Sequence, residues 1–303
     1  MKATLPAPFV RPVLVGTLAA LAAAMFNGTV GVLSRLGFEL AMDSHAVAFW
    51  RCFGAFALLT LLIVASPARR ARTVALRPDL PPIALCSFLG VFTLYHFETM
   101  AFALAPVPIV AMLVFAGGVV TILLSVVVLK ESMNAVKGFG IAMVFVGAFL
   151  ILMGHDLPLE ADFRGVIFAL IAGTGYWLFI FFWKYFRLPS GLEPLWWFFL
   201  FGTLYLAVPF LIESRVIPDS GALLVLAALV LLPSFGGFFC TTLAVRLVDA
   251  HRVQVIETSE PLFSAFFAFL LFGEMLSGLG MVGAAAIIGG MLTVAAGDRG
   301  APA

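Results

Sequence analysis

The chain has 303 residues, of which 63% are hydrophobic and only 11% carry a charge. Soluble domains carry about 25% charged residues, so this composition excludes an ordinary soluble protein and indicates an integral membrane protein. The net charge of +1 gives no reason to expect a nucleic-acid partner, and the three cysteines form no CxxC or metal-type cluster, so no metal or cofactor is expected.

Ten apolar segments follow one another along the chain. Each is near or above the length of about 20 residues that a helix needs to cross a bilayer. Continuous apolar runs without alternation favour helices over a barrel. The sequence therefore predicts an all-α membrane protein with ten transmembrane helices, at residues 13–36, 44–65, 81–104, 107–129, 135–153, 164–186, 193–214, 221–245, 252–273 and 277–296.

The basic residues indicate how these segments are oriented. If the segments cross the membrane alternately, thirteen of the 17 Lys and Arg residues lie on the side that holds both termini. The opposite side holds only Arg35, Arg164 and Arg215. Because cytoplasmic loops are enriched in basic residues, this asymmetry predicts that both termini are cytoplasmic.

The chain also repeats itself. Residues 99–150 fall on residues 242–293 when shifted by about 143 positions, which aligns Glu131 with Glu274. Each half contains five predicted spans, and because five is odd the second half would enter the membrane inverted. Inverted repeats are typical of secondary transporters, whose binding sites lie near the membrane midplane between the repeats. The two predicted five-helix repeats are residues 1–155 and 156–303.

Several stretches resemble the EamA-type drug/metabolite transporters. The resemblance is carried by EPLFSAFFAFLLFGE (Glu260–Glu274), GLGMVGAAAIIGGML (Gly278–Leu292), VVVLKE (Val126–Glu131), GFGIAMVFVGAFLIL (Gly138–Leu152) and FWRCFGAFALL (Phe49–Leu59). It implies a ten-helix transporter of the cell inner membrane that exports amino acids or other small metabolites and is not an enzyme. The ETSEP and HFE stretches depart from the family pattern.

The first and sixth spans supply candidate pocket residues. Asn27 lies in the first span, and Tyr176 and Trp177 lie in the matching sixth span. Aromatic walls with a few polar groups are typical of small-molecule sites, so these residues are expected to line a pocket. The alternative is ordinary packing for Asn27 and an interfacial position for the aromatic residues.

The second and third spans hold buried charges. Tyr95, His96 and Glu98 lie together in LYHFETMAF, where a histidine and a carboxylate would suit substrate binding or a proton relay. A hydrogen-bonded pair that only fixes packing is the alternative. Arg51 lies inside the second span, where the family resemblance also puts an arginine, and it is expected to form a structural ion pair with a buried acid.

The ninth span, His251–Glu274, is predicted as one helix that kinks at Pro261. Glu257 and Glu260 are one helical turn apart and should project from one face. Acids inside a membrane span usually face a cavity or a substrate path. We therefore expect both to line the cytoplasmic approach to a central cavity, although solvated acids near the membrane surface are the simpler alternative.

Glu131 and Glu274 each directly precede a predicted helix, so both are expected to stabilise a positive helix N-terminus. Small residues of the tenth span, including Ala286 and Gly290, permit close helix packing within the chain or contact between two copies in a homodimer.

The predicted function is a secondary transporter for small metabolites such as amino acids, working by alternating access with proton coupling or exchange. A channel or uniporter for a small polar solute is the alternative. An intramembrane enzyme is less favoured, because the sequence has no HExxH or GxSxG motif, and the lack of a P-loop argues against an ATP-driven pump.

Overall fold

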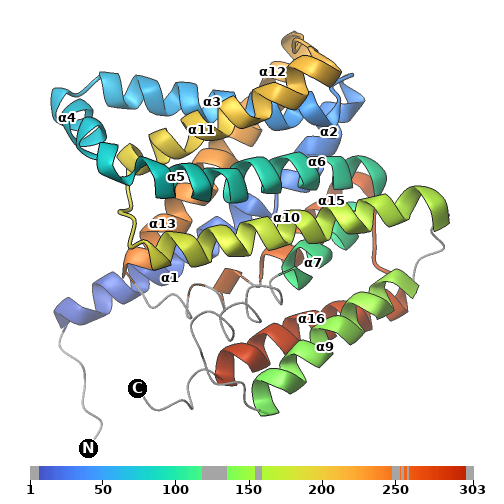
Figure 1. The fold of residues 1–303 in the computed structure, drawn as a ribbon. Coiled ribbons are helices and arrows are strands. Elements are labelled where there is room, and N and C mark those ends of the chain that lie inside the picture. The colour runs from blue at the N-terminus through green and yellow to red at the C-terminus, as the bar shows by residue number, and fades with distance from the viewer. Residues whose placement is uncertain are drawn as a thin grey trace, which may run out of the picture.

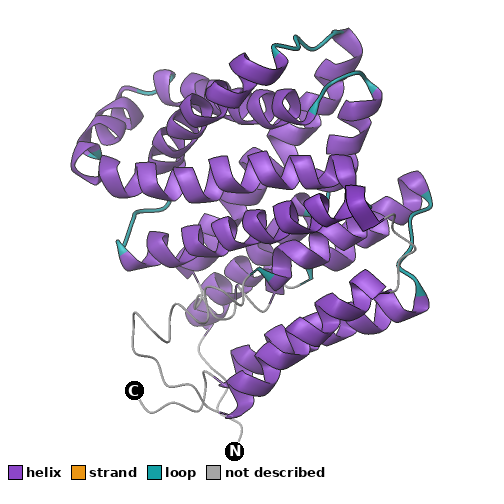
Figure 2. Ribbon diagram, turned by 45° about the vertical axis from the view of Figure 1, so that its right-hand side comes forward, coloured by secondary structure: helices purple, strands orange, loops and turns teal. Residues whose placement is uncertain are grey.

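The computed structural model describes residues 7–117, 135–153, 159–247, 253, 256–257 and 259–297. All regular secondary structure in these ranges is helical, which confirms the predicted all-α class (Figures 1 and 2). The helices of the first half are α1 (Ala7–Asn27), α2 (Val30–Glu39), α3 (Ser44–Val64), α4 (Pro67–Ala75), α5 (Leu80–Ser87), α6 (Leu94–Leu104), α7 (Val107–Ala116) and α9 (Ala135–Met153). Those of the second half are α10 (Leu159–Tyr185), α11 (Leu192–Pro209), α12 (Ser220–Leu229), α13 (Phe238–Leu247), α15 (Glu260–Phe272) and α16 (Gly278–Gly297).

Local sequence signals set several helix boundaries. Asp43 caps α3 by accepting a hydrogen bond from the Ala46 backbone N–H at 2.9 Å, and Asp219 caps α12 by accepting one from Ala222 at 2.8 Å. Wider π-helical turns or 3₁₀ turns connect or extend other helices. They lie at Arg77–Asp79, Phe88–Thr93, Phe210–Ser214 and Val230–Gly237.

Six helical stretches are long and apolar enough to cross a membrane, so the protein is a multi-pass membrane protein. These stretches are Val13–Glu39, Ser44–Val64, Arg77–Leu104, Phe163–Trp183, Leu192–Ser214 and Ser220–Ala244. Four shorter apolar helices fall in the remaining predicted segments: Val107–Ala116, Ala135–Leu150, Glu260–Phe272 and Gly278–Thr293. Ten crossings therefore stay a prediction, because the apolar stretches found in these four segments have only 10–17 residues in the described part of the chain.

Helices of the two halves pack in matching pairs. Counterparts lie against each other as α3 with α11, α7 with α15 and α9 with α16. The crossed pairs α6 with α10 and α1 with α13 also pack, and Figure 1 shows α9 and α16 side by side. Exchanging the two halves returns each of the first three pairs to itself and turns the two crossed pairs into each other, which is the pattern that two copies related by a twofold axis produce.

Reciprocal glycine contacts join α9 and α16. A Cβ atom at Gly147 would lie 2.5 Å from the Gly283 carbonyl oxygen, and one at Gly290 would lie 2.5 Å from the Gly140 carbonyl oxygen. The shift of about 143 positions pairs Gly140 with Gly283 and Gly147 with Gly290. Each contact is therefore the counterpart of the other, and Gly290 serves packing within the chain.

Two ion pairs connect the ends of different helices. In each pair, the sequence places both helix ends on the same membrane face. Arg35 at the end of the first span pairs with Glu274 after the ninth, both on the predicted outer face. Arg72 pairs with Glu193 at 2.8 Å, both on the predicted cytoplasmic face. These pairings support the alternating passage of the spans through the membrane.

Candidate functional site

Two interrupted helices meet between the halves. Residues 28–29 form a turn between α1 and α2, and Ser259 forms a turn directly before α15. A Cβ atom at Gly28 would lie 2.7 Å from Cβ of Phe263, so the two interruptions are in contact. Interrupted helices are how many transporters present polar backbone groups to a substrate.

The prediction of one kinked helix over His251–Glu274 is wrong in the part that the structure describes. Helix α15 begins only at Glu260, with Pro261 in its first turn. Proline favours this position, because its fixed backbone angle suits a helix start and its missing N–H has no helical partner there. Pro261 therefore starts a helix instead of bending one.

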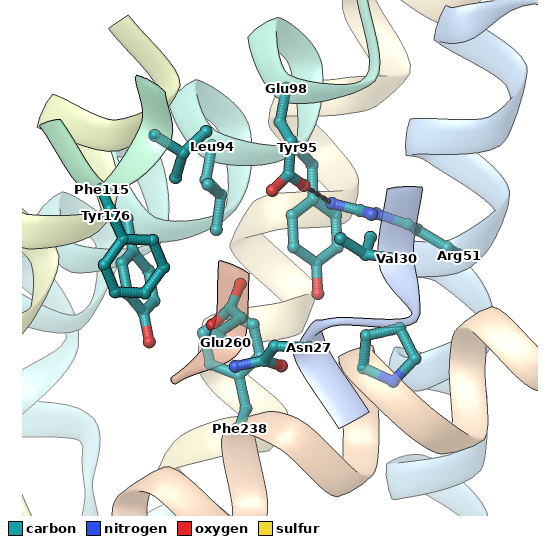
Figure 3. A pocket seen from close by; sticks show the side chains of 12 residues that line it. Asn27, Val30, Arg51, Leu94, Tyr95, Glu98, Phe115, Tyr176, Phe238 and Glu260 are labelled. Carbon is teal, nitrogen blue, oxygen red and sulfur yellow. Dashed lines mark hydrogen bonds and ion pairs between the residues drawn. The ribbon is translucent and has the colours of Figure 1, made fainter. Parts of the chain in front are cut away.

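A small buried cavity lies between the two halves (Figure 3). Its volume is about 30 Å³, which leaves room for about one or two water-sized groups. Both halves contribute to a wall that is mostly apolar with a few converging polar groups, as in small-molecule sites. The lining residues are Asn27, Val30, Arg51, Leu94, Tyr95, Glu98, Val114 and Phe115 from the first half, and Tyr176, Pro233, Phe238 and Glu260 from the second.

Arg51 and Glu98 form a buried ion pair at one end of the cavity. Arg51 Nη2 lies 3.0 Å from Glu98 Oε2, and the arginine side chain is 1% exposed. The Arg51 Cζ atom also lies 3.5 Å from the centre of the Tyr95 ring, a cation–π contact. The predicted ion pair of Arg51 with a buried acid is therefore present, and the structure identifies Glu98 as its partner.

Glu260 and Asn27 lie together in the cavity wall. They come from the two helix interruptions, and the Asn27 amide faces the Glu260 carboxyl group (Figure 3). A Cβ atom at Gly237 would collide with Oδ1 of Asn27, so this position has room only for glycine. The Asn27 side chain thus packs directly against the backbone at Gly237.

Glu257 lies behind the cavity wall and is 1% exposed. The Thr241 hydroxyl donates a hydrogen bond of 2.8 Å to its Oε1, and the Tyr176 hydroxyl lies 3.5 Å from its Oε2. Because Tyr176 also lines the cavity, Glu257 is connected to the cavity through this hydroxyl.

A larger chamber of about 580 Å³ begins on the other side of Thr241. Arg187 and Arg246 are among its lining residues, and both lie on the predicted cytoplasmic face. Glu257 therefore contacts one residue of the chamber and one residue of the cavity. Glu257 lines neither of them, and Glu260 lines the cavity itself, so the expectation that both acids line a cytoplasmic approach stays a prediction.

Two expected site residues lie elsewhere. His96 stacks on Phe92 and lies 5.1 Å from the ring of His45, centre to centre, and it does not line the cavity. Trp177 is buried against the edge of Phe115, behind the wall, and does not line the cavity either. Neighbours in a helix point about 100° apart, since a turn has 3.6 residues, so only Tyr95 and Tyr176 of these adjacent pairs face inward.

The predictions for the two acids at helix ends, Glu131 and Glu274, have different outcomes. Glu131 lies outside the described residues. The Glu274 carboxylate accepts a hydrogen bond of 3.0 Å from the Val107 backbone N–H, at the start of α7, and pairs with Arg35. It thus lies at a helix N-terminus, but at that of α7 and not at that of α16, which follows it in the sequence.

Sequence reasoning missed Thr241, Pro233, Phe115 and Phe238. Neither the threonine nor the two phenylalanines differ from packing residues in a span that is apolar on every face. Pro233 had a usable signal, because PSFGG places proline and glycine inside the eighth span, and such interruptions often mark binding sites.

A model of the EamA-like transporter family matches the chain over residues 14–153 and 163–296, once in each half. The chain belongs to the EamA-like transporter family. The resemblance drawn from the sequence is thereby confirmed. This EamA-like protein is a membrane transporter of the drug/metabolite transporter type, and it is not an enzyme.

One similar solved structure, described only as "Crystal structure of protein", has a TM-score of 0.66 and 17% sequence identity. The match covers 94% of this EamA-like chain and 97% of that chain, and at this identity it shows a shared fold alone. No curated protein matches the chain.

Proposed function

We propose that this EamA-like transporter is a secondary transporter that exports small metabolites such as amino acids by alternating access, with proton coupling or exchange. The observation that carries the proposal is the small cavity between the halves, which brings together Arg51, Glu98 and Glu260. Charged groups inside a membrane protein mark substrate and ion paths.

The proposal includes the topology. Ten helices form two inverted five-helix repeats, residues 1–155 and 156–303, with both termini on the cytoplasmic side of the inner membrane. The matching helix pairs and the distribution of basic residues support this arrangement.

Access to the cavity differs at its two ends. On the proposed outer side, the Arg35–Glu274 ion pair joins the first and ninth spans. On the proposed cytoplasmic side, the chamber of about 580 Å³ reaches Thr241, which contacts Glu257. This difference supports a conformation in which the cavity is closed toward the proposed outer side and is closer to opening toward the proposed cytoplasmic side.

Glu257 is the proposed coupling residue. Its carboxyl group stands between a residue of the chamber and a residue of the cavity, and its contacts described above are hydroxyl groups. Carboxyl groups in membrane proteins form proton relays, because they can take up a proton on one side and release it on the other. Glu260, which lines the cavity itself, is the proposed contact for the substrate.

Efflux from proteoliposomes tests the proposed function. Liposomes containing the purified protein are loaded with a mixture of the twenty amino acids, and release is followed by mass spectrometry with and without a pH gradient. We expect a subset of amino acids to leave faster than from protein-free liposomes, with saturation and with acceleration by the gradient. Release that neither saturates nor responds to the gradient would instead identify a channel.

A further inference from the structure

The protein uses only part of the hydrogen-bonding capacity of Arg51. A guanidinium group has five N–H donors. Nη2 contacts Glu98, but Nε and Nη1 are buried and have no hydrogen-bond partner in the part of the chain that the structure describes. A buried donor without a partner is unfavourable, so a ligand that supplies an acceptor would bind here without displacing a protein contact.

The guanidinium group is also held in a fixed position. Tyr95 covers one face at 3.5 Å, and Glu98 holds Nη2 at 3.0 Å. A charged group that is already oriented loses little conformational freedom when a ligand binds. Because Arg51 lines the cavity, its unused donors form a prepared site for an anionic oxygen.

The other end of the cavity holds an acidic residue, Glu260, instead of an arginine. Figure 3 shows Arg51 and Glu98 at one end, and Glu260 with Asn27 at the other. Glu98 is balanced by Arg51, whereas no cation is found beside Glu260 among the residues that line the cavity. The Asn27 amide nitrogen lies on the Glu260 side and its oxygen points toward Gly237, so the Glu260 carboxylate itself is the acceptor that suits an ammonium group, which donates up to three hydrogen bonds.

We propose that Arg51 binds the carboxylate of a zwitterionic substrate and that Glu260 binds its ammonium group. The substrate class is then α-amino acids with both groups free, and Arg51 has a binding role in addition to its ion pair. The inference rests on the proposed function, because it assigns the ligand of the same cavity. Phe115 and Phe238 in the wall would face an apolar substrate side chain.

The test compares three sets of solutes in proteoliposomes: free amino acids, their carboxamides and their N-acetyl derivatives. The carboxamides lack the carboxylate, and the N-acetyl derivatives lack the ammonium group. We expect the wild-type protein to release free amino acids at least about tenfold faster than either derivative, since losing a hydrogen bond to a charged group changes binding by about that factor.

Two variants separate binding from folding. Arg51→Gln with Glu98→Gln replaces the ion pair by neutral groups of similar shape, and it should lose the preference for free amino acids over carboxamides. Glu98→Gln alone keeps the arginine but removes the carboxylate that orients it, so the preference should weaken less than in the double variant. The control is Arg72→Gln with Glu193→Gln, which removes an ion pair outside the cavity and should change nothing.

Each outcome of these experiments either supports or overturns the assignment of Arg51 as the carboxylate-binding residue. Carboxamides released as fast as free amino acids by the wild type, or an unchanged preference in the double variant at the cavity, would overturn the role of Arg51 while leaving transport itself intact. If no solute leaves faster than from protein-free liposomes, the proposed function fails, and the assignment of Arg51 fails with it. The wild-type comparison stands even if the double variant does not fold.

Discussion

At the residue scale, three acids inside the protein have three different surroundings: Glu98 and Glu257 are buried, and Glu260 is half-buried. Glu98 has a guanidinium partner, Glu257 has two hydroxyl groups, and Glu260 begins a helix beside an amide. Because a carboxylate in an apolar medium depends strongly on its partners, the three should respond differently to the same substitution. We expect the pair of Arg51 with Glu98 to stabilise the fold, beside the proposed binding role of Arg51, and we propose transport roles for the other two acids.

Removing Arg51 should destabilise the protein. Arg51→Ala leaves Glu98 buried without its cation, so we expect a loss of about 3–5 kcal/mol in the free energy of unfolding. Adding Glu98→Gln should restore part of this loss, because no uncompensated charge is then left. Thermal unfolding in detergent measures both effects, and equal stability of Arg51→Ala and the wild type would contradict the account.

Removing the charge of Glu257 should uncouple transport from the pH gradient. Glu257→Gln keeps the shape and can still bond to Thr241 and Tyr176, but it cannot carry a proton. We expect efflux that no longer accelerates when a pH gradient is imposed. Glu39→Gln, at an exposed helix end, is the matched control. A normal response of Glu257→Gln to the gradient would make Glu257 a structural residue.

At the scale of secondary-structure elements, the geometry of the site depends on one helix that ends and one that begins at the cavity. The turn between α1 and α2 places Asn27 at the cavity, and the start of α15 places Glu260 there. Had either stretch continued as a regular helix, its backbone N–H and carbonyl groups would be bonded within the helix and its side chains directed differently. The contact between the two interruptions at Gly28 therefore controls the geometry of the site.

Filling the space at Gly28 should separate the two interruptions. In Gly28→Ala the new methyl group would lie 2.7 Å from Cβ of Phe263 and 3.1 Å from the backbone nitrogen of Ser264. We expect overpacking to lower the free energy of unfolding by about 1–3 kcal/mol and to slow transport. Gly138→Ala is the control, because nothing lies within 4 Å of a Cβ atom there. Equal stability and equal transport rates of Gly28→Ala and Gly138→Ala would refute this role of Gly28.

At the scale of the whole molecule, most of the fold could be predicted from sequence. The apolar runs indicated the helices, and the small residues of the tenth span indicated close packing, which the structure shows between α9 and α16. These features depend on span length and on the absence of side chains, both of which are visible in sequence.

The orientation of side chains within the site was less predictable. Helix α10 is apolar on every face, so its sequence does not reveal that Tyr176 and not Trp177 faces the cavity. His96 and Tyr95 are adjacent, and only packing against other helices decides which one points inward. The break before Glu260 was missed because a proline after an apolar stretch can either bend a helix or begin one.

The proposed topology predicts opposite labelling of two exposed positions. Val74 lies in α4 on the proposed cytoplasmic side, and Ile217, which is 80% exposed, follows the seventh span on the proposed outer side. In a background without native cysteines, Val74→Cys should react with a membrane-impermeant thiol reagent only from the cytoplasm, and Ile217→Cys only from outside. Labelling of both positions from one side would contradict the inverted repeat.

The central claim is that substrate movement through the cavity is coupled to protons. The most direct measurement places a pH-sensitive dye inside proteoliposomes loaded with the amino acids that the efflux experiment identifies, with no pH gradient at the start. Because coupling works in both directions, amino acids that leave down their gradient should draw protons in and acidify the interior. Amino-acid efflux at the normal rate with no change in internal pH, compared with protein-free liposomes, would contradict the claim.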